Sequence, residues 1–180
     1  TDTYQVTAQA SPNGLWMPAA PKTAVDHLVA DNIDAASTIS AVELSPEGNL
    51  WCSNVGDSKT LVVRRDGGAN RVLYSSPLHN EAAEGLDHPM ARHTLTQSIW
   101  RHQMSVQPTL DRIQVQPGDV VIVTTDGVHE VVLETDLTDL ALAGEPSDAV
   151  SEIVWQVEGA SQTDNATVCI GLVSEAGRSD

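Results

Sequence analysis

Short β-type runs separated by turn residues follow one another closely between residues 37 and 74 of this chain. Four such runs follow one another, at residues 37–44, 50–55, 61–65 and 71–74. The residues between them are of types that favour tight turns: Pro46-Glu-Gly-Asn49, Gly56-Asp57-Ser58 and Asp66-Gly-Gly68. Strands joined by short connections pair as hairpins, so this part of the chain predicts antiparallel β-structure.

Further strands and helices are predicted before and after these runs. The strands are expected at residues 4–10, 110–115, 120–123 and 167–173. The helices are expected at residues 24–33, 136–142 and 147–157, the last with Ser147 as its N-cap. Antiparallel strands with helices early and late indicate an α+β fold, in which helices cover the sheets.

The organisation predicted for residues 1–180 is a single domain, because no repeat or low-complexity linker interrupts the chain and its length suffices for one core. Residues 75–104 have poor periodicity and high polarity, which is typical of a long functional loop. The polar residues 174–180 predict a frayed tail.

The chain is strongly acidic, with 25 Asp and Glu residues against 9 Lys and Arg and a formal net charge of −16. A nucleic-acid-binding protein needs a basic surface to neutralise phosphates, so nucleic acids and anionic membranes are not expected as partners. The excess carboxylate is compatible with divalent cations, and equally with a role in solubility alone. No apolar run approaches the roughly 18 residues of a membrane span.

Two cysteines, Cys52 and Cys169, each lie inside an apolar run without a second Cys or His at zinc-ligand spacing. They are predicted to be buried free thiols, and a single disulfide between them is the open alternative. Free thiols fit a reducing compartment, and the sequence carries no recognisable secretory signal. A cytoplasmic location is therefore expected.

Three aspartates lie at the ends of apolar strands, each beside Gly or Asn: Asp57, Asp126 and Asp164. Carboxylates at strand ends are held on rigid elements but open to solvent, and hard cations such as Mg²⁺ and Mn²⁺ prefer oxygen ligands. Two bridged metal ions would activate a shared water and stabilise a phosphoryl displacement. The alternative is that Asp-Gly and Asp-Ser are ordinary turn residues.

Four segments carry a more specific pattern, in a fixed order along the chain. They are Ala36-Ser-Thr-Ile-Ser-Ala-Val-Glu-Leu44, Leu50-Trp-Cys-Ser-Asn-Val-Gly-Asp-Ser-Lys59, Gln116-Pro-Gly-Asp-Val-Val-Ile-Val-Thr-Thr-Asp-Gly-Val-His-Glu130 and Ser161-Gln-Thr-Asp-Asn-Ala-Thr-Val168. Together they resemble the metal-dependent Ser/Thr protein phosphatases, the type 2C or PPM family, over residues 36–173. The resemblance implies two packed antiparallel β-sheets flanked by helices, an αββα sandwich.

The resemblance also implies a metal centre with two core Mn²⁺ or Mg²⁺ ions and a third, looser one. Asp126 and Asp164 correspond to ligands of the two-metal centre, with Gly127 beside Asp126 in the same motif. Asp57 corresponds to an aspartate near the looser ion, and Glu130 falls where the family usually has an Asp serving that ion. No residue beyond a metal-bound water is expected to be catalytic.

Histidines are frequent near these segments. His79, His88, His93 and His102 lie in the irregular stretch, which resembles the family's flap beside the active site and suggests substrate contact. They show no regular zinc spacing. His129 follows Asp126 closely, and a partly exposed surface position is the expectation for it.

Two family motifs are missing from residues 1–35, which match the family poorly. The phosphate-contacting Arg with its Asn-Glu-Asp segment is absent near Ser11, and the Asp-Gly-His/Met-Gly-Gly segment is absent near Pro18. Three explanations stay open: the two loops belong to the protein but are missing from this sequence, the site has degenerated, or the chain is a shortened form.

The function expected from the resemblance is hydrolysis of phosphoserine or phosphothreonine on proteins by a metal-bound water, as in bacterial signal transduction. The expected partners are a phosphoprotein substrate and a cognate Ser/Thr kinase or its targets, with the chain itself a monomer. The alternative is a catalytically dead pseudophosphatase that acts as a binding or regulatory module. A third hypothesis is an unrelated acidic α+β domain in which the Asp turns are coincidental.

Overall fold

The computed structural model describes residues 26, 29–32, 34–100, 102, 106–160 and 164–175. Within these residues the strands are β1 (Ala36–Ser37), β2 (Ile39–Leu44), β3 (Asn49–Val55), β4 (Lys59–Asp66), β5 (Ala69–Ser75), β6 (Ile99–Trp100), β7 (Thr109–Gln114), β8 (Val120–Thr124) and β9 (Val168–Leu172). The helices are α2 (Asp126–His129), α3 (Glu134–Ala143) and α4 (Pro146–Gly159).

Two main antiparallel sheets carry the fold. One has the strand order β2-β3-β7 and the other the order β5-β4-β8-β9, while β1 and β6 form a short separate pair. Turn glycines set the hairpins: Gly48 (φ +78°) lies between β2 and β3, and Gly67 (φ +57°) and Gly68 (φ +91°) lie between β4 and β5. The hairpins β2-β3 and β4-β5 therefore join neighbouring segments, as the turn pattern predicts. The Gly56-Asp57-Ser58 turn instead carries the chain from one sheet to the other, because β3 and β4 do not pair.

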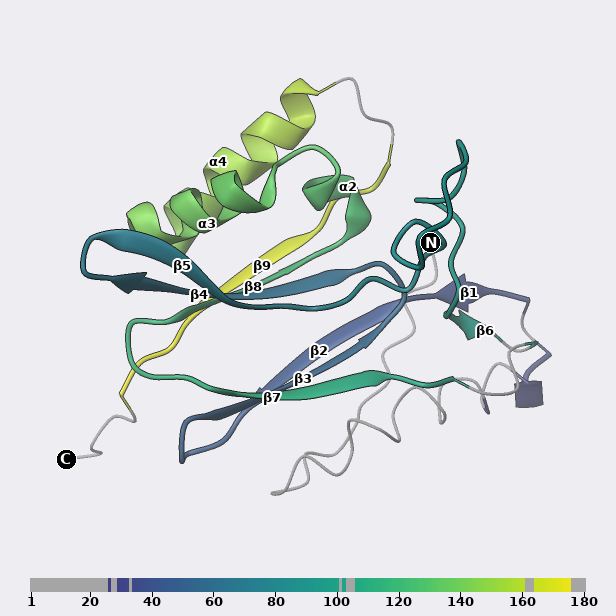
Figure 1. Cartoon of the computed structure of the whole chain (residues 1–180), viewed down its shortest axis with the longest axis horizontal. Coiled ribbons are helices and arrows are strands. Elements are labelled where there is room, and N and C mark those ends of the chain that lie inside the picture. The colour runs from purple at the N-terminus through teal and green to yellow at the C-terminus, as the bar shows by residue number, and fades with distance from the viewer. Residues whose placement is uncertain are drawn as a thin grey trace.

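The layers are stacked as helices, sheet and sheet (Figure 1). Helices α3 and α4 cover one face of the β5-β4-β8-β9 sheet, and the β2-β3-β7 sheet lies on its other face. Alternate residues of β4 serve the two interfaces: Leu61 and Val63 pack toward the helices, whereas Val62 packs between the sheets. Two apolar cores result, one on each side of the same sheet.

Hydroxyl groups join the two sheets near the start of β4. The Oγ1 of Thr38 lies 2.8 Å from the Oγ of Ser58, and the Oγ of Ser40 lies 2.7 Å from the Oγ1 of Thr60. Buried polar groups need such partners because an unpaired one loses its bonds to water. The sandwich is thus polar at the end where β4 begins.

Most predicted elements are present, with small shifts of their ends. The helix expected to begin after Ser147 starts at Pro146, with Glu145 as N-cap, because proline is well suited to the first helical position. Cys169 is exposed rather than buried, since it lies in the edge strand β9, whereas Cys52 is buried as predicted; both thiols are free. The strand predicted at residues 4–10 and most of the helix predicted at residues 24–33 lie outside the described residues.

Residues 75–104 contain little regular structure, as their weak periodicity predicts. Beyond the end of β5 and the short strand β6, the segment consists of turns and loops with one isolated bridge between Asn80 and Leu95. In the described part of the chain, each helix is too short or too polar to cross a membrane.

Candidate active site

Strand register brings three aspartate-bearing loops to one end of the β5-β4-β8-β9 sheet. Lys59 of β4 pairs with Thr124 of β8, and Thr124 pairs in turn with Val168 of β9. Asp57 precedes that row of paired residues on β4, Asp126 follows it on β8, and Asp164 precedes it on β9. Because neighbouring strands run antiparallel, all three aspartates lie at the same end of the sheet.

Asp126 begins the short helix α2 directly after β8. The backbone N–H of Gly127 donates a 2.9 Å hydrogen bond to the Oδ1 of Asp126, which orients the carboxylate at the helix N-terminus. The loop is tied to the other side of the site as well, since Thr125 N–H donates to the carbonyl oxygen of Thr167 at 3.0 Å. The position of Asp126 is therefore fixed by backbone contacts on both sides.

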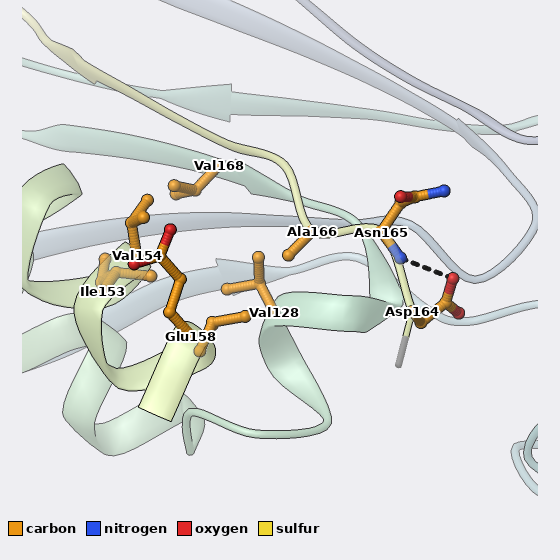
Figure 2. A pocket seen from close by; sticks show the side chains of 9 residues that line it. Val128, Ile153, Val154, Glu158, Asp164, Asn165, Ala166 and Val168 are labelled. Carbon is orange, nitrogen blue, oxygen red and sulfur yellow. Dashed lines mark hydrogen bonds between the residues drawn. The ribbon is translucent and has the colours of Figure 1, made fainter. Parts of the chain in front are cut away.

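Asp164 lies in the neighbouring loop, just before β9. The N–H of Asn165 donates to the Oδ1 of Asp164 at 2.7 Å (Figure 2), the same local arrangement as at Asp126. The two loops are in close contact, because a Cβ atom placed on Gly127 would lie 2.5 Å from the carbonyl oxygen of Asn165. Only glycine fits there without a shift of the backbone, so Gly127 sets the spacing of the two loops.

Asp57 is in an environment that disfavours its charge. Burial raises the pKa of its carboxyl group, and the nearby carboxylates of Asp126 and Glu130 raise it further. The ring of His93 acts in the opposite direction, and its Nδ1 lies 3.7 Å from the Oε1 of Glu130. The carboxyl group of Asp57 thus lies close enough to those of Asp126 and Glu130 for like-charge repulsion to disfavour its charged form.

A divalent cation would relieve this repulsion, and an all-oxygen donor set is the kind that Mg²⁺ and Mn²⁺ prefer. Within the described residues, however, no three His, Cys, Asp or Glu side chains converge closely enough to hold a metal ion. The donors fit such a cation in kind, but they do not complete a site. The assignment of Asp57, Asp126, Gly127, Glu130 and Asp164 as metal-binding residues stays a prediction.

His129 ends α2 and lies against β8. It is half-buried, its Nδ1 lies 3.2 Å from the Oγ1 of Thr124, and burial together with the charge of Lys59 lowers its pKa. Lys59 itself contacts the Oε2 of Glu134 at 2.7 Å, at the start of α3. The ring is thus held against β8 and is partly exposed, as expected.

The burial of His79 and its contact with Gly56 are not predicted by the sequence pattern. This residue is buried, and its ring contacts the backbone of Gly56 directly before Asp57. A histidine in a polar, irregular stretch gives no local signal of burial, so only the contact with a segment 23 residues away identifies its role. The expectation of substrate contact is not supported for this histidine.

A pocket of about 320 Å³ lies beside the Asp164 loop, on the helix side of the sheet. Its wall is mainly apolar and comes from α2, α4 and the start of β9, with Val128, Ile153, Val154, Val157, Glu158, Asp164, Asn165, Ala166 and Val168 as its lining. Figure 2 shows Asp164 and Asn165 at one end of this pocket, apart from the aliphatic side chains. Asp57 and Asp126 do not line it, so it is distinct from the site of these two carboxylates.

Comparison of the sequence with known proteins finds similarity to a protein phosphatase. No model of a protein family matches the chain. The chain is 24% identical over 133 residues to protein phosphatase PhpP of Streptococcus pneumoniae, as found in two strains. The aligned part covers 68% of this chain and 52% of PhpP, so the chain spans about half the length of the curated relatives it matches.

Solved structures of bacterial Ser/Thr phosphatases share the fold. Stp1 from Staphylococcus aureus matches with a TM-score of 0.75 and 16% identity, over 94% of this chain and 71% of Stp1. The catalytic domain of PstP, in complex with two manganese ions, matches with a TM-score of 0.67 and 18% identity, over 85% of this chain and 66% of that one. These similarities confirm the predicted fold of packed antiparallel sheets with helices and support the predicted resemblance to PPM phosphatases.

Proposed function

We propose that this chain hydrolyses phosphoserine or phosphothreonine on proteins with the help of bound Mn²⁺ or Mg²⁺. The observation that carries the proposal is that three aspartate-bearing loops lie at the same end of the paired strands β4, β8 and β9. The name of the relative PhpP and the manganese ions in the PstP structure support it further. The proposed partners are a phosphoprotein and a cognate Ser/Thr kinase or its targets. We propose that the chain acts on them as a monomer in the cytoplasm.

In this proposal Asp126 and Asp164 hold the core ions, while Asp57 and Glu130 serve the looser one. Divalent cations bound there would lower the pKa of a water molecule and place positive charge near the phosphoryl oxygens. The protein's own contribution is orientation. The N–H groups of Gly127 and Asn165 fix the neighbouring carboxylates, and the contact between these loops fixes their separation.

The test is Mn²⁺-dependent release of phosphate from a phosphothreonine peptide by the full chain. We expect Asp126→Asn to lower kcat/KM by about 100-fold or more, because a lost ligand removes several kcal/mol of transition-state stabilisation. The matched control is Asp66→Asn, an exposed aspartate at the opposite end of β4 from Asp57, which should retain wild-type activity. Metal-dependent activity that survives in Asp126→Asn would contradict the assignment.

A pseudophosphatase is the second candidate, and a specific observation favours it. No described trio of carboxylate, histidine or cysteine side chains is close enough to hold a metal ion, and the Asp-Gly-His/Met-Gly-Gly segment is absent from the sequence. In that case the chain would bind a phosphoprotein without hydrolysing it. Calorimetry distinguishes the two: specific Mn²⁺ binding that Asp164→Ala weakens supports the enzyme, whereas peptide binding without any Mn²⁺ heat supports the binding module.

A further inference from the structure

We propose that His79 is a positioning residue that fixes the backbone turn carrying Asp57, and that it does so through the N–H and carbonyl groups of Gly56. The turn itself is a structural feature, and its importance for metal binding rests on the function proposed above. His79 lies in the irregular segment between β5 and β6, and Asp57 lies between β3 and β4. The contact therefore joins two loops that are distant in sequence.

Both ring nitrogens of His79 have partners, and the residue is only 8% exposed. Gly56 N–H donates to the Nδ1 of His79 at 3.1 Å, and the Nε2 lies 2.9 Å from the Oγ1 of Thr109. Because a backbone N–H can only donate, Nδ1 must carry the lone pair. The hydrogen of the neutral ring is therefore on Nε2, which donates to the Thr109 hydroxyl.

The backbone of His79 completes the clamp. Its own N–H donates to the carbonyl oxygen of Gly56 at 2.9 Å, so both polar backbone groups of Gly56 bind one residue. The Nδ2 of Asn54 donates to the same carbonyl at 3.2 Å and to the carbonyl of Pro77 at 3.0 Å. The turn is held from the irregular segment at several points.

Gly56 has no side chain that could stabilise the turn. Its backbone φ of +100° is one that residues other than glycine rarely adopt. A Cβ atom there would also lie 2.3 Å from the Cγ2 of Thr38. Glycine is conformationally free in other states, so an outside contact has to select this one. The buried ring of His79 supplies that contact at the residue immediately before Asp57.

The clamp also connects Asp57 to the rest of the irregular segment. The carbonyl oxygen of His79 accepts a hydrogen bond from Thr96 N–H at 2.9 Å, and the Nδ2 of Asn80 donates to the carbonyl of Arg92 at 3.1 Å. The segment that contributes His93 near Glu130 is thus held by the residues around His79. Loss of the ring should loosen the Asp57 turn and leave the Asp126 and Asp164 loops unchanged.

The experiment compares His79→Gln and His79→Asn in the full chain. The amide oxygen of Asn can replace Nδ1 as acceptor for Gly56 N–H, whereas Gln reaches toward the Nε2 position instead. His88→Gln is the matched control, because the His88 ring is exposed. Circular dichroism checks that each variant is folded, and hydrogen exchange measured by NMR follows the Gly56 amide directly.

We expect Gly56 N–H to exchange at least about tenfold faster in His79→Gln than in the wild type, with His79→Asn closer to the wild type. The imidazole ¹⁵N shifts of wild-type His79 should report a hydrogen on Nε2. Unchanged exchange in a folded His79→Gln, or a hydrogen on Nδ1, would overturn the clamp.

Metal titration separates this proposal from the function on which its importance rests. If the wild type binds Mn²⁺, we expect His79→Gln to weaken its lowest-affinity site by about tenfold and to spare the tighter sites. We expect the same pattern for Asp57→Asn. Equal affinity in His79→Gln and the wild type overturns the role toward the metal. If the wild type binds no Mn²⁺, the proposed function fails, and the exchange data alone decide whether His79 holds the turn.

Discussion

Gly127 lies so close to Asn165 that a Cβ atom on the glycine would be 2.5 Å from the asparagine carbonyl oxygen. Gly127→Ala must therefore push the Asp126 and Asp164 loops apart. We expect this substitution to reduce the free energy of unfolding by about 1–3 kcal/mol, as overpacking does. Mn²⁺ affinity, measured by calorimetry, should fall as well if the two loops bind metal.

Gly159→Ala is the matched control for that substitution. Gly159 ends α4, and a Cβ atom there meets nothing within 4 Å. Because alanine favours helix more than glycine does, stability should stay unchanged or rise by up to about 1 kcal/mol. Equal stability of Gly127→Ala and Gly159→Ala would contradict the close contact.

The hydroxyl pair between Ser40 and Thr60 should behave as a unit across the two sheets. Thr60→Val leaves the Ser40 hydroxyl without its partner at 2.7 Å, and Ser40→Ala does the same to the nearly inaccessible Thr60 hydroxyl. Each single change should cost about 1–2 kcal/mol in urea unfolding, and the double variant should cost less than the sum. Strictly additive losses would show that the two hydroxyls are independent.

Arg64 pairs with the fully buried carboxylate of Asp119. The Nε and Nη2 atoms of Arg64 lie 2.6 and 2.7 Å from the two carboxylate oxygens, and Gln116 N–H donates to one of them. Arg64→Met keeps the apolar stem but leaves a buried charge unpaired, so we expect a loss of about 3–5 kcal/mol. Arg71→Met, on the exposed residue opposite Arg64 in β5, should change stability by less than about 0.5 kcal/mol.

The two thiols should differ sharply in reactivity. Cys52 is almost inaccessible, and burial together with the charge of Asp111 raises its pKa to about 12, whereas Cys169 is exposed in β9. Because the thiolate is the reactive form, a disulfide reagent such as dithiobis(nitrobenzoate) should titrate one thiol in the native protein and both in concentrated guanidinium. Cys169→Ser should abolish the native reaction, and fast labelling of that variant would argue against the burial of Cys52.

Acid should destabilise the metal-free protein partly through His79. Burial lowers the pKa of His79 below its ordinary 6.5, and the charge of Glu84 opposes this only in part. As the pH falls, His79 therefore binds a proton in the unfolded state before it does so in the folded state. The free energy of unfolding should fall as the pH drops through about 6.5. Urea unfolding between about pH 7.5 and 5.5 should show a smaller fall for His79→Asn. Part of the fall should remain, since the pKa of His129 is also lowered.

Local pattern was sufficient for most elements of the fold. The apolar run at 50–55 between two turn segments corresponds to β3, and the helical spacing at 147–157 corresponds to α4. Such signals arise from neighbouring residues alone, so they need no knowledge of the partner strand. The start of α4 differs from the expected one by two residues, because Ser147 as N-cap places the first helical residue at 148, whereas Pro146 occupies the first helical position.

Roles that depend on distant partners were beyond the reach of local pattern. Nothing in the residues around Asp119 indicates burial, yet Asp119 is buried and bonded to Arg64, 55 residues earlier. His79 likewise acquires its role from Gly56. The aspartates of the candidate site could be named from their motifs. Their position at the same end of the sheet, however, follows from the register of β4, β8 and β9.

That register makes assembly of the site a late event in folding. Lys59 and Thr124 are far apart in the chain, and their pairing requires closure of the long segment between them before Asp57 and Asp126 can meet. Non-local strand pairs of this kind form slowly compared with helices and hairpins. The β4-β5 hairpin and α4 can therefore form while the carboxylates are still separate. If the carboxylates bind metal as proposed, recovery of that binding during refolding would report the final joining of β4, β8 and β9.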